Sequence, residues 1–445
     1  MIRTIVLFPL LAFILISSGF GSFWELYTEN LKEDITFQQQ SLRLMSAEQG
    51  YKQYEDFFQP YVTFGTGKGN GMIFNEEGLK SSSFGLNANL LHVFGTDIGL
   101  SIPFSYVKDR KSSNGESQED FKIENISMNI SRDLISEDNA DKLQKKADML
   151  SASFTLNQAA WTVFIGTVKS IFDIRYNREL LLLYEKKSDI YSELMEEATD
   201  SDNRRNYEKM YLNAEKLRIG VESIMLELSK YEVLTDEDVD SIYGEILLLI
   251  PDMYENSVEK DIFLRNDIRS LALSKQAAEE KAELWFLPYF PNPHLTFTPS
   301  FNVADPELDF EDRFSWSLSV QCDMTLFDRG EMESESISRK GNAEIKKLEY
   351  SQKTDSLEKK IESLHLEEKK SMLDYEIKQI DYQIVKESYE RNQKLYKKGY
   401  ITQNDMKLSE IEFIQKKLDY EKAFQQLLMD KLNIMKETVD TPGGY

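Results

Sequence analysis

The chain has 445 residues and a formal net charge of −24, and 29% of its residues are charged while 41% are hydrophobic. These values exclude a polytopic helical membrane protein, which needs repeated apolar runs of about 20 residues. So acidic a surface also repels nucleic acid and anionic lipid headgroups. The composition favours long solvated helices, and it leaves open whether the acidic residues form an ordinary surface or line a tunnel.

Residues 1–21 are predicted to be a secretory signal peptide. Arg3 precedes an apolar run over residues 5–16, and small residues follow up to Gly21, where we expect cleavage. The alternative is an uncleaved anchor. Cys322 is the only cysteine and lies far from this region, so we expect neither an N-terminal lipid anchor nor a disulfide within the chain.

After this segment the sequence shows two copies of one pattern, namely a helix, strands, a long helix, a tip turn and a helix. We assign residues 22–230 to the first structural repeat and residues 231–254 to an equatorial connector. Residues 255–437 form the second structural repeat, and residues 438–445 form a C-terminal tail. An internal repeat of this kind decides the architecture, and the predicted fold class is mainly α with a β-barrel segment.

The first repeat is predicted to contain helices over residues 24–58, 140–199 and 205–228. Its strand-like segments lie at 61–65, 83–91, 98–107 and 121–131. The glycine-rich stretch 65–71 and the polar stretch 111–117 are typical of exposed loops. The pattern does not decide between one hairpin with a decorated loop and two hairpins.

The connector contains Thr235 and Asp238, a pair that is typical of a helix N-terminus. The second repeat is predicted to contain helices over residues 258–287, 331–398 and 404–436. Its strands are predicted at 295–303 and 314–326. Pro60 and Pro288 stand at the entry to the two strand regions, where proline stops a helix because it lacks an amide donor.

The last strand has the pattern of a membrane barrel. Apolar and polar residues alternate strictly over residues 314–326, which is long enough to cross a bilayer when tilted, since about 9–11 residues are needed. The apolar row predicted to face lipid contains Phe314, Trp316, Leu318 and Val320. The serines between them are expected to face the lumen. A half-buried strand of a soluble sandwich has the same alternation and is the alternative.

The long helix of the second repeat carries two apolar seams. One seam contains Leu357, Ile361, Leu364, Tyr375, Tyr382, Val385, Tyr389 and Tyr396. The other contains Leu366, Leu373, Ile377, Ile380 and Ile384. At about 100° per residue the seams lie on opposite sides, so the helix needs a neighbour on each side, as in the wall of a helical cylinder. Residues 143–171 repeat this pattern in the first copy. The alternative is a long helix in a bundle with one broad apolar face.

The stretch from Leu395 to Asp405, together with residues 326–330 between the last strand and the long helix, resembles the TolC family of outer-membrane factors. The resemblance covers nearly all of the mature sequence. It implies a homotrimer with a twelve-stranded transmembrane β-barrel and a twelve-helix α-barrel tunnel. It also implies a passive conduit in the outer membrane, extending into the periplasm, that works in efflux or type I secretion with a periplasmic adaptor protein and an inner-membrane transporter.

The resemblance further implies roles for residues at the periplasmic tip. Gly399 matches the glycine of the family's tip turn, where an adaptor hairpin approaches closely, and Tyr396 and Asp405 match polar positions of the gate region. The corresponding place in the first copy is Ala198. The resemblance therefore does not carry a docking groove over to the first tip.

The two tips differ in charge, because Glu196 and Glu197 in the first copy align with Lys397 and Lys398 in the second. In a ring that alternates the two copies, acidic and basic tips would lie side by side. We hypothesise that attraction between them holds the tunnel end closed. The alternative is that both pairs are solvated surface charges, which contribute only about 0–1 kcal/mol each.

The sequence shows no constellation of catalytic residues. His92, His294 and His365 are scattered without metal-ligand spacing. Cys322 lies in the apolar row of its strand and is expected to act as filler. We therefore expect no enzyme, no cofactor and no metal. The main alternative to a channel is a periplasmic coiled-coil adaptor or interaction protein without a membrane barrel, which would need compact β-domains flanking one hairpin.

Overall fold

The computed structural model describes residues 21–55, 61–66, 72–75, 78–93, 96–109, 118–123, 125–228, 234–256, 262–290, 292–303, 309–322, 329–439 and 442. The predicted signal peptide lies outside the described residues, except for Gly21. The same holds for most of both predicted loops and for the first three residues of the 326–330 stretch.

The chain divides into two compact units. The helical unit comprises residues 1–42, 153–266 and 353–445, and the sheet unit comprises residues 43–152 and 267–352. Each unit takes segments from both predicted repeats. The long helices contribute residues to both units.

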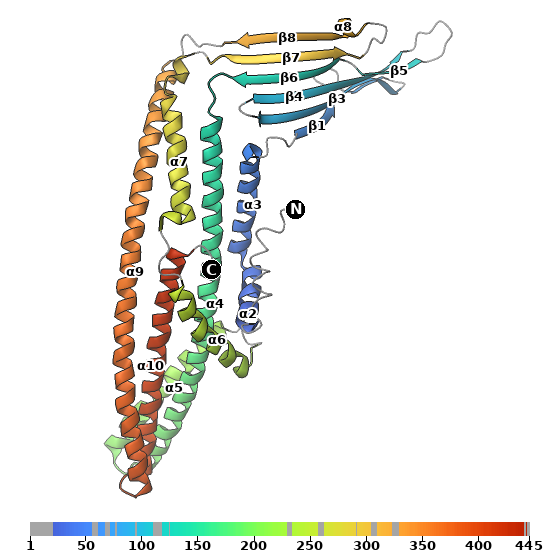
Figure 1. Cartoon of the computed structure of the whole chain (residues 1–445). Helices are drawn as coiled ribbons and strands as arrows, with labels where there is room; N and C mark the ends of the chain where they lie inside the picture. The colour runs from blue at the N-terminus through green and yellow to red at the C-terminus, as the bar shows by residue number, and fades with distance from the viewer. Residues whose placement is uncertain are drawn as a thin grey trace. The chain divides into compact units, whose positions relative to one another are not determined.

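The helices follow the predicted order (Figure 1). They are α2 (Gly21–Glu33), α3 (Ile35–Glu55), α4 (Asp138–Glu197), α5 (Ser201–Glu227), α6 (Asp236–Glu255), α7 (Asn266–Glu283), α9 (Glu331–Lys397) and α10 (Gln403–Thr438). The described residues also contain three short helical turns: η2 (Ile262–Leu264), η3 (Leu287–Tyr289) and α8 (Phe310–Arg313). The first predicted helix is divided at Asp34, whose carboxylate accepts a 2.6 Å hydrogen bond from the amide of Phe37 at the start of α3.

Reciprocal caps start two of these helices. Asp238 donates its amide to Thr235 Oγ1 at 3.2 Å and accepts the amide of Thr235 at 3.0 Å, which confirms the helix start predicted there. Thr402 and Asp405 form the same capping box at α10. The hydrogen bonds from Thr402 hold the pKa of Asp405 below its ordinary value.

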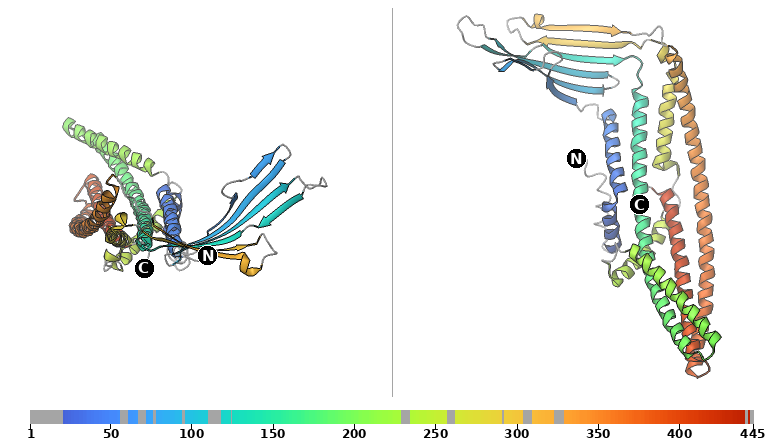
Figure 2. Two further views of the ribbon diagram at one scale, coloured as in Figure 1. Left: turned by 90° about the horizontal axis from the view of Figure 1, so that it is seen from above. Right: turned by 180° about the vertical axis from the view of Figure 1, so that it is seen from behind.

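The strands form one antiparallel sheet, seen from two further directions in Figure 2. They are β1 (Tyr61–Thr66), β2 (Met72–Asn75), β3 (Gly78–Val93), β4 (Thr96–Asp109), β5 (Gln118–Ile123), β6 (Asn125–Asp133), β7 (His294–Asn302) and β8 (Phe314–Gln321). The order is β1-β3-β4-β6-β7-β8, with β2 also on β3 and β5 also on β4. β1 and β2 pair with successive parts of β3, and β6 and β5 with successive parts of β4.

The register answers the question that the sequence left open, because the first repeat contributes two hairpins rather than one. The path across the sheet has six strands, four from the first repeat and two from the second. A twelve-stranded barrel of three chains would need four. Within the described residues the sheet is open, with β1 and β8 at its edges.

The core of the helical unit is built where α2, α4, α6 and α10 meet. Trp161, Phe164, Val168 and Ile171 of α4 recur at helical spacing and are fully buried. Phe23 of α2 packs edge-on against Phe164, with ring centroids 5.3 Å apart. A second cluster joins Leu183, Ile190 and Leu194 of α4 to Ile411 and Leu418 of α10. α4 is therefore attached to α10 along much of its length.

Candidate functional site

One face of the sheet is apolar across all six strands of the path. Cross-strand pairs on this face include Leu86 with Ile102, Leu100 with Met128, Ile130 with Phe297, and Phe297 with Leu318. All four residues predicted to face lipid lie on it, namely Phe314, Trp316, Leu318 and Val320. They remain 46–62% exposed, and so does Phe64 of β1 at 67%.

The opposite face carries hydroxyl and amide groups in the same registers. The pairs on this face include Asn87 with Ser101, Ser101 with Ser127, Ser127 with Ser300, and Ser300 with Ser315. A hollow of about 160 Å³ lies over Gly99 and is lined by asparagines, serines and Asp97. Any Cβ at Gly99 would lie 2.7 Å from Asn89 Oδ1, so a glycine keeps this part of the polar face open.

A hydrogen-bonded junction fixes the point where the sheet meets its helices. The side-chain amide of Asn292 donates to the carbonyl oxygen of Ile135 at 2.7 Å, and its oxygen accepts the amide of Ile135 at 3.1 Å. His294 Nδ1 lies 2.7 Å from Asp133 Oδ1. The first residues of β7 are thereby tied to the end of β6, beside the start of α4.

The second predicted seam of α9 is exposed in the folded chain. Leu357 of the first seam is 3% exposed, and Tyr375 stacks on Tyr420 of α10 with centroids 5.2 Å apart. The opposite seam, which consists of Leu366, Leu373, Ile377, Ile380 and Ile384, is 54–63% exposed. α5 carries a similar uncovered row, in which Leu212, Ile219 and Leu226 are 58–70% exposed.

The second tip, between α9 and α10, is a tight turn around Gly399. This residue has φ +76°, a left-handed conformation that suits glycine at the end of a helix. The amide of Tyr400 donates to the carbonyl oxygen of Leu395 at 3.0 Å, which closes the turn. Tyr396, Lys397 and Lys398 are exposed.

The first tip, between α4 and α5, lies against the start of α10 in the same chain. Asn404 donates its side-chain amide to Glu197 Oε2 at 2.7 Å, and Lys407 forms an ion pair with Glu193. Glu196 is exposed and Ala198 is half-buried. Sequence reasoning placed the acidic residues of this tip beside Lys397 and Lys398, and it missed Glu193, Asn404 and Lys407. The only sequence signal for Glu193 and Lys407 was opposite charge on two helices distant in sequence, which is too common to be specific, and the uncharged Asn404 gave no such signal.

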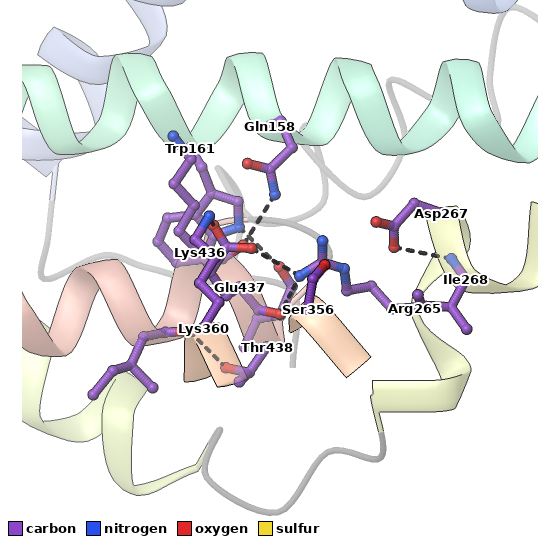
Figure 3. Close-up of polar contacts among 12 residues, drawn as sticks. Gln158, Trp161, Arg265, Asp267, Ile268, Ser356, Lys360, Lys436, Glu437 and Thr438 are labelled. Carbon is purple, nitrogen blue, oxygen red and sulfur yellow. Dashed lines mark hydrogen bonds and ion pairs between the residues drawn. The ribbon is translucent and has the colours of Figure 1, made fainter. Parts of the chain in front are cut away.

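A buried ion pair of Arg265 and Glu437, joined by the exposed Lys360, anchors the end of α10 (Figure 3). Arg265 Nη1 donates to both the backbone oxygen and the carboxylate of Glu437, at 2.7 and 2.8 Å, and Lys360 Nζ of α9 lies 2.5 Å from the same carboxylate. Trp161 Nε1 of α4 donates to the carbonyl oxygen of Val439 at 2.9 Å. Burial raises the pKa of Glu437, but the two cations outweigh it and hold the pKa below its ordinary value.

The part of the chain that the structure describes contains no group of three or more histidine, cysteine or carboxylate side chains placed to hold a metal ion. None of the described helices is long and apolar enough to span a membrane.

No family model and no curated protein matches the sequence. Solved structures match the fold. The CmeC outer membrane channel of Campylobacter jejuni aligns over 94% of this chain and 86% of its own, with a TM-score of 0.56 and 13% identity. The outer membrane protein VceC of Vibrio cholerae aligns over 94% and 95%, with a TM-score of 0.57 and 12% identity.

The MtrE outer membrane channel of Neisseria gonorrhoeae, in its open state, aligns over 94% of this chain and 89% of its own, with a TM-score of 0.57 and 12% identity. At 12–13% identity these matches show similarity of fold alone. The chain therefore has the fold of outer-membrane channels, in agreement with the resemblance to the TolC family that its tip sequence shows.

Proposed function

We propose that the chain is the outer-membrane channel component of a tripartite efflux or type I secretion system, and that it acts as a passive conduit from the periplasm to the exterior. The observation that carries this proposal is the sheet face that is apolar across six strands, exposed on β1 and β8 and mostly half-buried on the strands between them, in a chain with the fold of outer-membrane channels. An apolar patch this continuous is unfavourable in water and matches the lipid face of a membrane barrel. The sheet would lie in the outer membrane, and the helices would extend into the periplasm.

The functional unit in this proposal is a homotrimer. α9 leaves one apolar seam uncovered, and α5 leaves an apolar row uncovered. In a ring of identical subunits, each contact joins two different faces, one from each copy. The uncovered seam of α9 on one copy can therefore pack on the uncovered row of α5 on the next copy. Three copies would place α9 of one copy beside α5 of the next and complete a helical tunnel.

The tips are proposed to receive a periplasmic adaptor protein, which links the channel to an inner-membrane transporter. Gly399 has no heavy atom within 4 Å of its missing Cβ position, so a partner helix could approach the backbone there. Tyr396, Lys397 and Lys398 would flank it, and Glu196, Glu197 and Ala198 would form the neighbouring first tip. Asp405 belongs to the capping box that starts α10. Its contribution to a gate would therefore be to hold the start of α10, and with it the turn at the tip, in place.

The membrane assignment is tested by a matched pair of substitutions on neighbouring residues of β8. Leu318→Arg puts a charge on the apolar face in the middle of β8 and should cost about 2–4 kcal/mol near mid-membrane, whereas Ser317→Arg puts it on the polar face and should mainly change conductance. The measurement is the fraction of full-length protein that assembles into bilayers as particles of three chains. Equal loss with both substitutions would contradict the assigned face. A water-soluble particle that never enters membranes would favour the adaptor alternative.

The docking assignment is tested at Gly399. Gly399→Trp should abolish export while the particle still inserts, because the large side chain blocks backbone approach. Gly399→Asn is the matched control, since asparagine tolerates a positive φ and adds a small side chain. Unchanged export with Gly399→Trp would remove this turn from the docking site. Equal loss of assembly with both substitutions would show that the glycine serves only the fold.

A further inference from the structure

The hairpin of β3 and β4 lies in the interior of the sheet, between two strands that adjoin helices. β1 is the next element after α3, and β6 is the last element before α4. β1 pairs with β3, and β6 pairs with β4, so the hairpin separates β1 from β6. β3 and β4 remain paired up to Val93 and Thr96 and adjoin no helix. The hairpin cannot leave the sheet without detaching β1 as well.

The inserted hairpin carries the same two faces as the rest of the sheet. Leu86 of β3 is paired with Phe64 of β1 and with Ile102 of β4, all on the apolar face. Asn87 is paired with Thr63 and with Ser101 on the polar face. A lid folded over a pore would have no reason to continue this alternation in register. The pattern indicates that β1, β3 and β4 share the environment of β6, β7 and β8.

The two edges of the sheet are β1 and β8, and each presents one side of its backbone without a partner strand in the described part of the chain. Such edges are costly in lipid, because no water satisfies their amide and carbonyl groups. Both edge strands present apolar side chains on the same face, with Val62 54% exposed on β1 and Val320 62% exposed on β8. One neighbouring copy at each edge can therefore satisfy the edge strands and continue both faces.

We propose that β8 of one copy pairs with β1 of the next, and that three copies close an eighteen-stranded barrel in which the β3–β4 hairpin widens the wall. This inference rests on the trimeric channel proposed above and adds the identity of the pairing edges and the width of the pore. From strand spacings of about 4.8 Å and tilts of about 40°, such a barrel is about 36 Å across, against about 24 Å for twelve strands. Barrels of about 16–18 strands enclose an open aqueous lumen.

The pairing is tested by disulfide cross-linking of the full-length protein in a Cys322→Ser background. Thr63→Cys on β1 is combined in turn with Ser315→Cys, Ser317→Cys and Ser319→Cys on β8. Three partners are used because the proposal does not specify which residue of β8 lies opposite Thr63. At least one combination should give cross-linked dimers and trimers in denaturing gels. Thr298→Cys with Ser317→Cys, which are paired within one chain, should give a disulfide without a rise in mass. Thr63→Cys with Thr298→Cys on β7 should give no cross-link.

Other ways of closing the barrel predict different cross-links. A cross-link between chains from Ser317→Cys to Ser101→Cys on β4, without one to β1, would mean that β1 and β3 lie outside the barrel and would overturn the inference. A Thr63–β8 link that joins one chain to itself would also overturn it, as would the absence of every β1–β8 link in a particle of three chains. Imaging of that particle should show a membrane barrel of about 36 Å, and a diameter of about 24 Å would contradict it. A particle of one chain would instead contradict the proposed channel itself.

Discussion

α4 and α9 carry the same sequence pattern and meet different surroundings. Each has two apolar seams on opposite sides. In α4 both seams are buried within the chain: Trp161 and Phe164 are fully buried on one side, and Leu156 and Ala159 are 6% and 8% exposed on the other. In α9 only the seam that faces α10 is covered, and Leu373 and Ile380 on the opposite side are 54% and 57% exposed.

The difference shows that the same pattern of two seams does not determine whether the second seam is covered within its own chain. α4 finds both neighbours in its own chain, because α2 and α6 pack on it as well as α10. The side chains of the free seam of α9 are 54–63% exposed, so complete burial would give each of them a little over half of the roughly 1.5–3 kcal/mol that a fully exposed side chain gains. That gain is available only from a partner outside the described residues of this chain, which is why the proposed assembly uses α9 as a contact between copies.

The strongest test of the inner helix is Trp161→Ala. The side chain is fully buried, so its loss leaves a cavity and should lower the free energy of unfolding by about 3–5 kcal/mol. Chemical denaturation of the protein in detergent, followed by far-ultraviolet circular dichroism, gives the value. Trp161→Phe is the control, because it keeps most of the apolar volume and loses the hydrogen bond to Val439, at a cost of about 1 kcal/mol. Equal effects of the two substitutions would mean that the indole hydrogen bond, and not packing, holds α4.

The next effect is expected at Glu437, which links α9 to the end of α10. Glu437→Gln leaves Arg265 buried without its counter-charge and should cost about 3 kcal/mol, as measured by the same denaturation. The pKa of Glu437 is lower in the folded than in the unfolded chain, so the carboxylate contributes stability above its unfolded pKa, and this contribution is lost as the pH falls through the folded value. The wild type should therefore lose more stability than the variant below about pH 4.5. Parallel pH profiles for the two proteins would exclude this carboxylate from the acid response.

The smallest effect on the chain and the largest on the assembly are expected at the free seam of α9. Ile380→Ser should change the stability of a single chain by less than about 0.5 kcal/mol, because the side chain is already exposed. It should lower the fraction of particles with three chains, as measured by light scattering in mild detergent. Asp374→Ser, on an exposed position off the seam, is the control and should leave that fraction unchanged. An unchanged fraction with Ile380→Ser would mean that the seam is not covered by another copy.

Local sequence determined the helices and much of their ends. The Thr235–Asp238 cap, the break at Gly399 and the apolar spacing of α4 and α9 depend on residues within one or two turns of each other, so they can be recognised without knowing the fold. The strict alternation of β8 likewise predicted its two faces. The division of the first helix at Asp34 was missed, and the helix predicted from residue 258 begins as α7 only at Asn266.

The number of hairpins, the six-strand path and the contacts of the tips were decided by tertiary structure. The sequence predicted β3 and β4 as two of several strands without giving their positions in the sheet. Only their pairing with β1 and β6 places them in its interior. Arg265 and Glu437 are 172 residues apart, and their ion pair exists because α10 ends beside the turn that precedes α7. The alternation of side chains is a property of neighbouring residues, and a sequence can carry it alone. Which strand or charge lies opposite depends on the path of the whole chain, and that path is set by the burial of surfaces far apart in sequence.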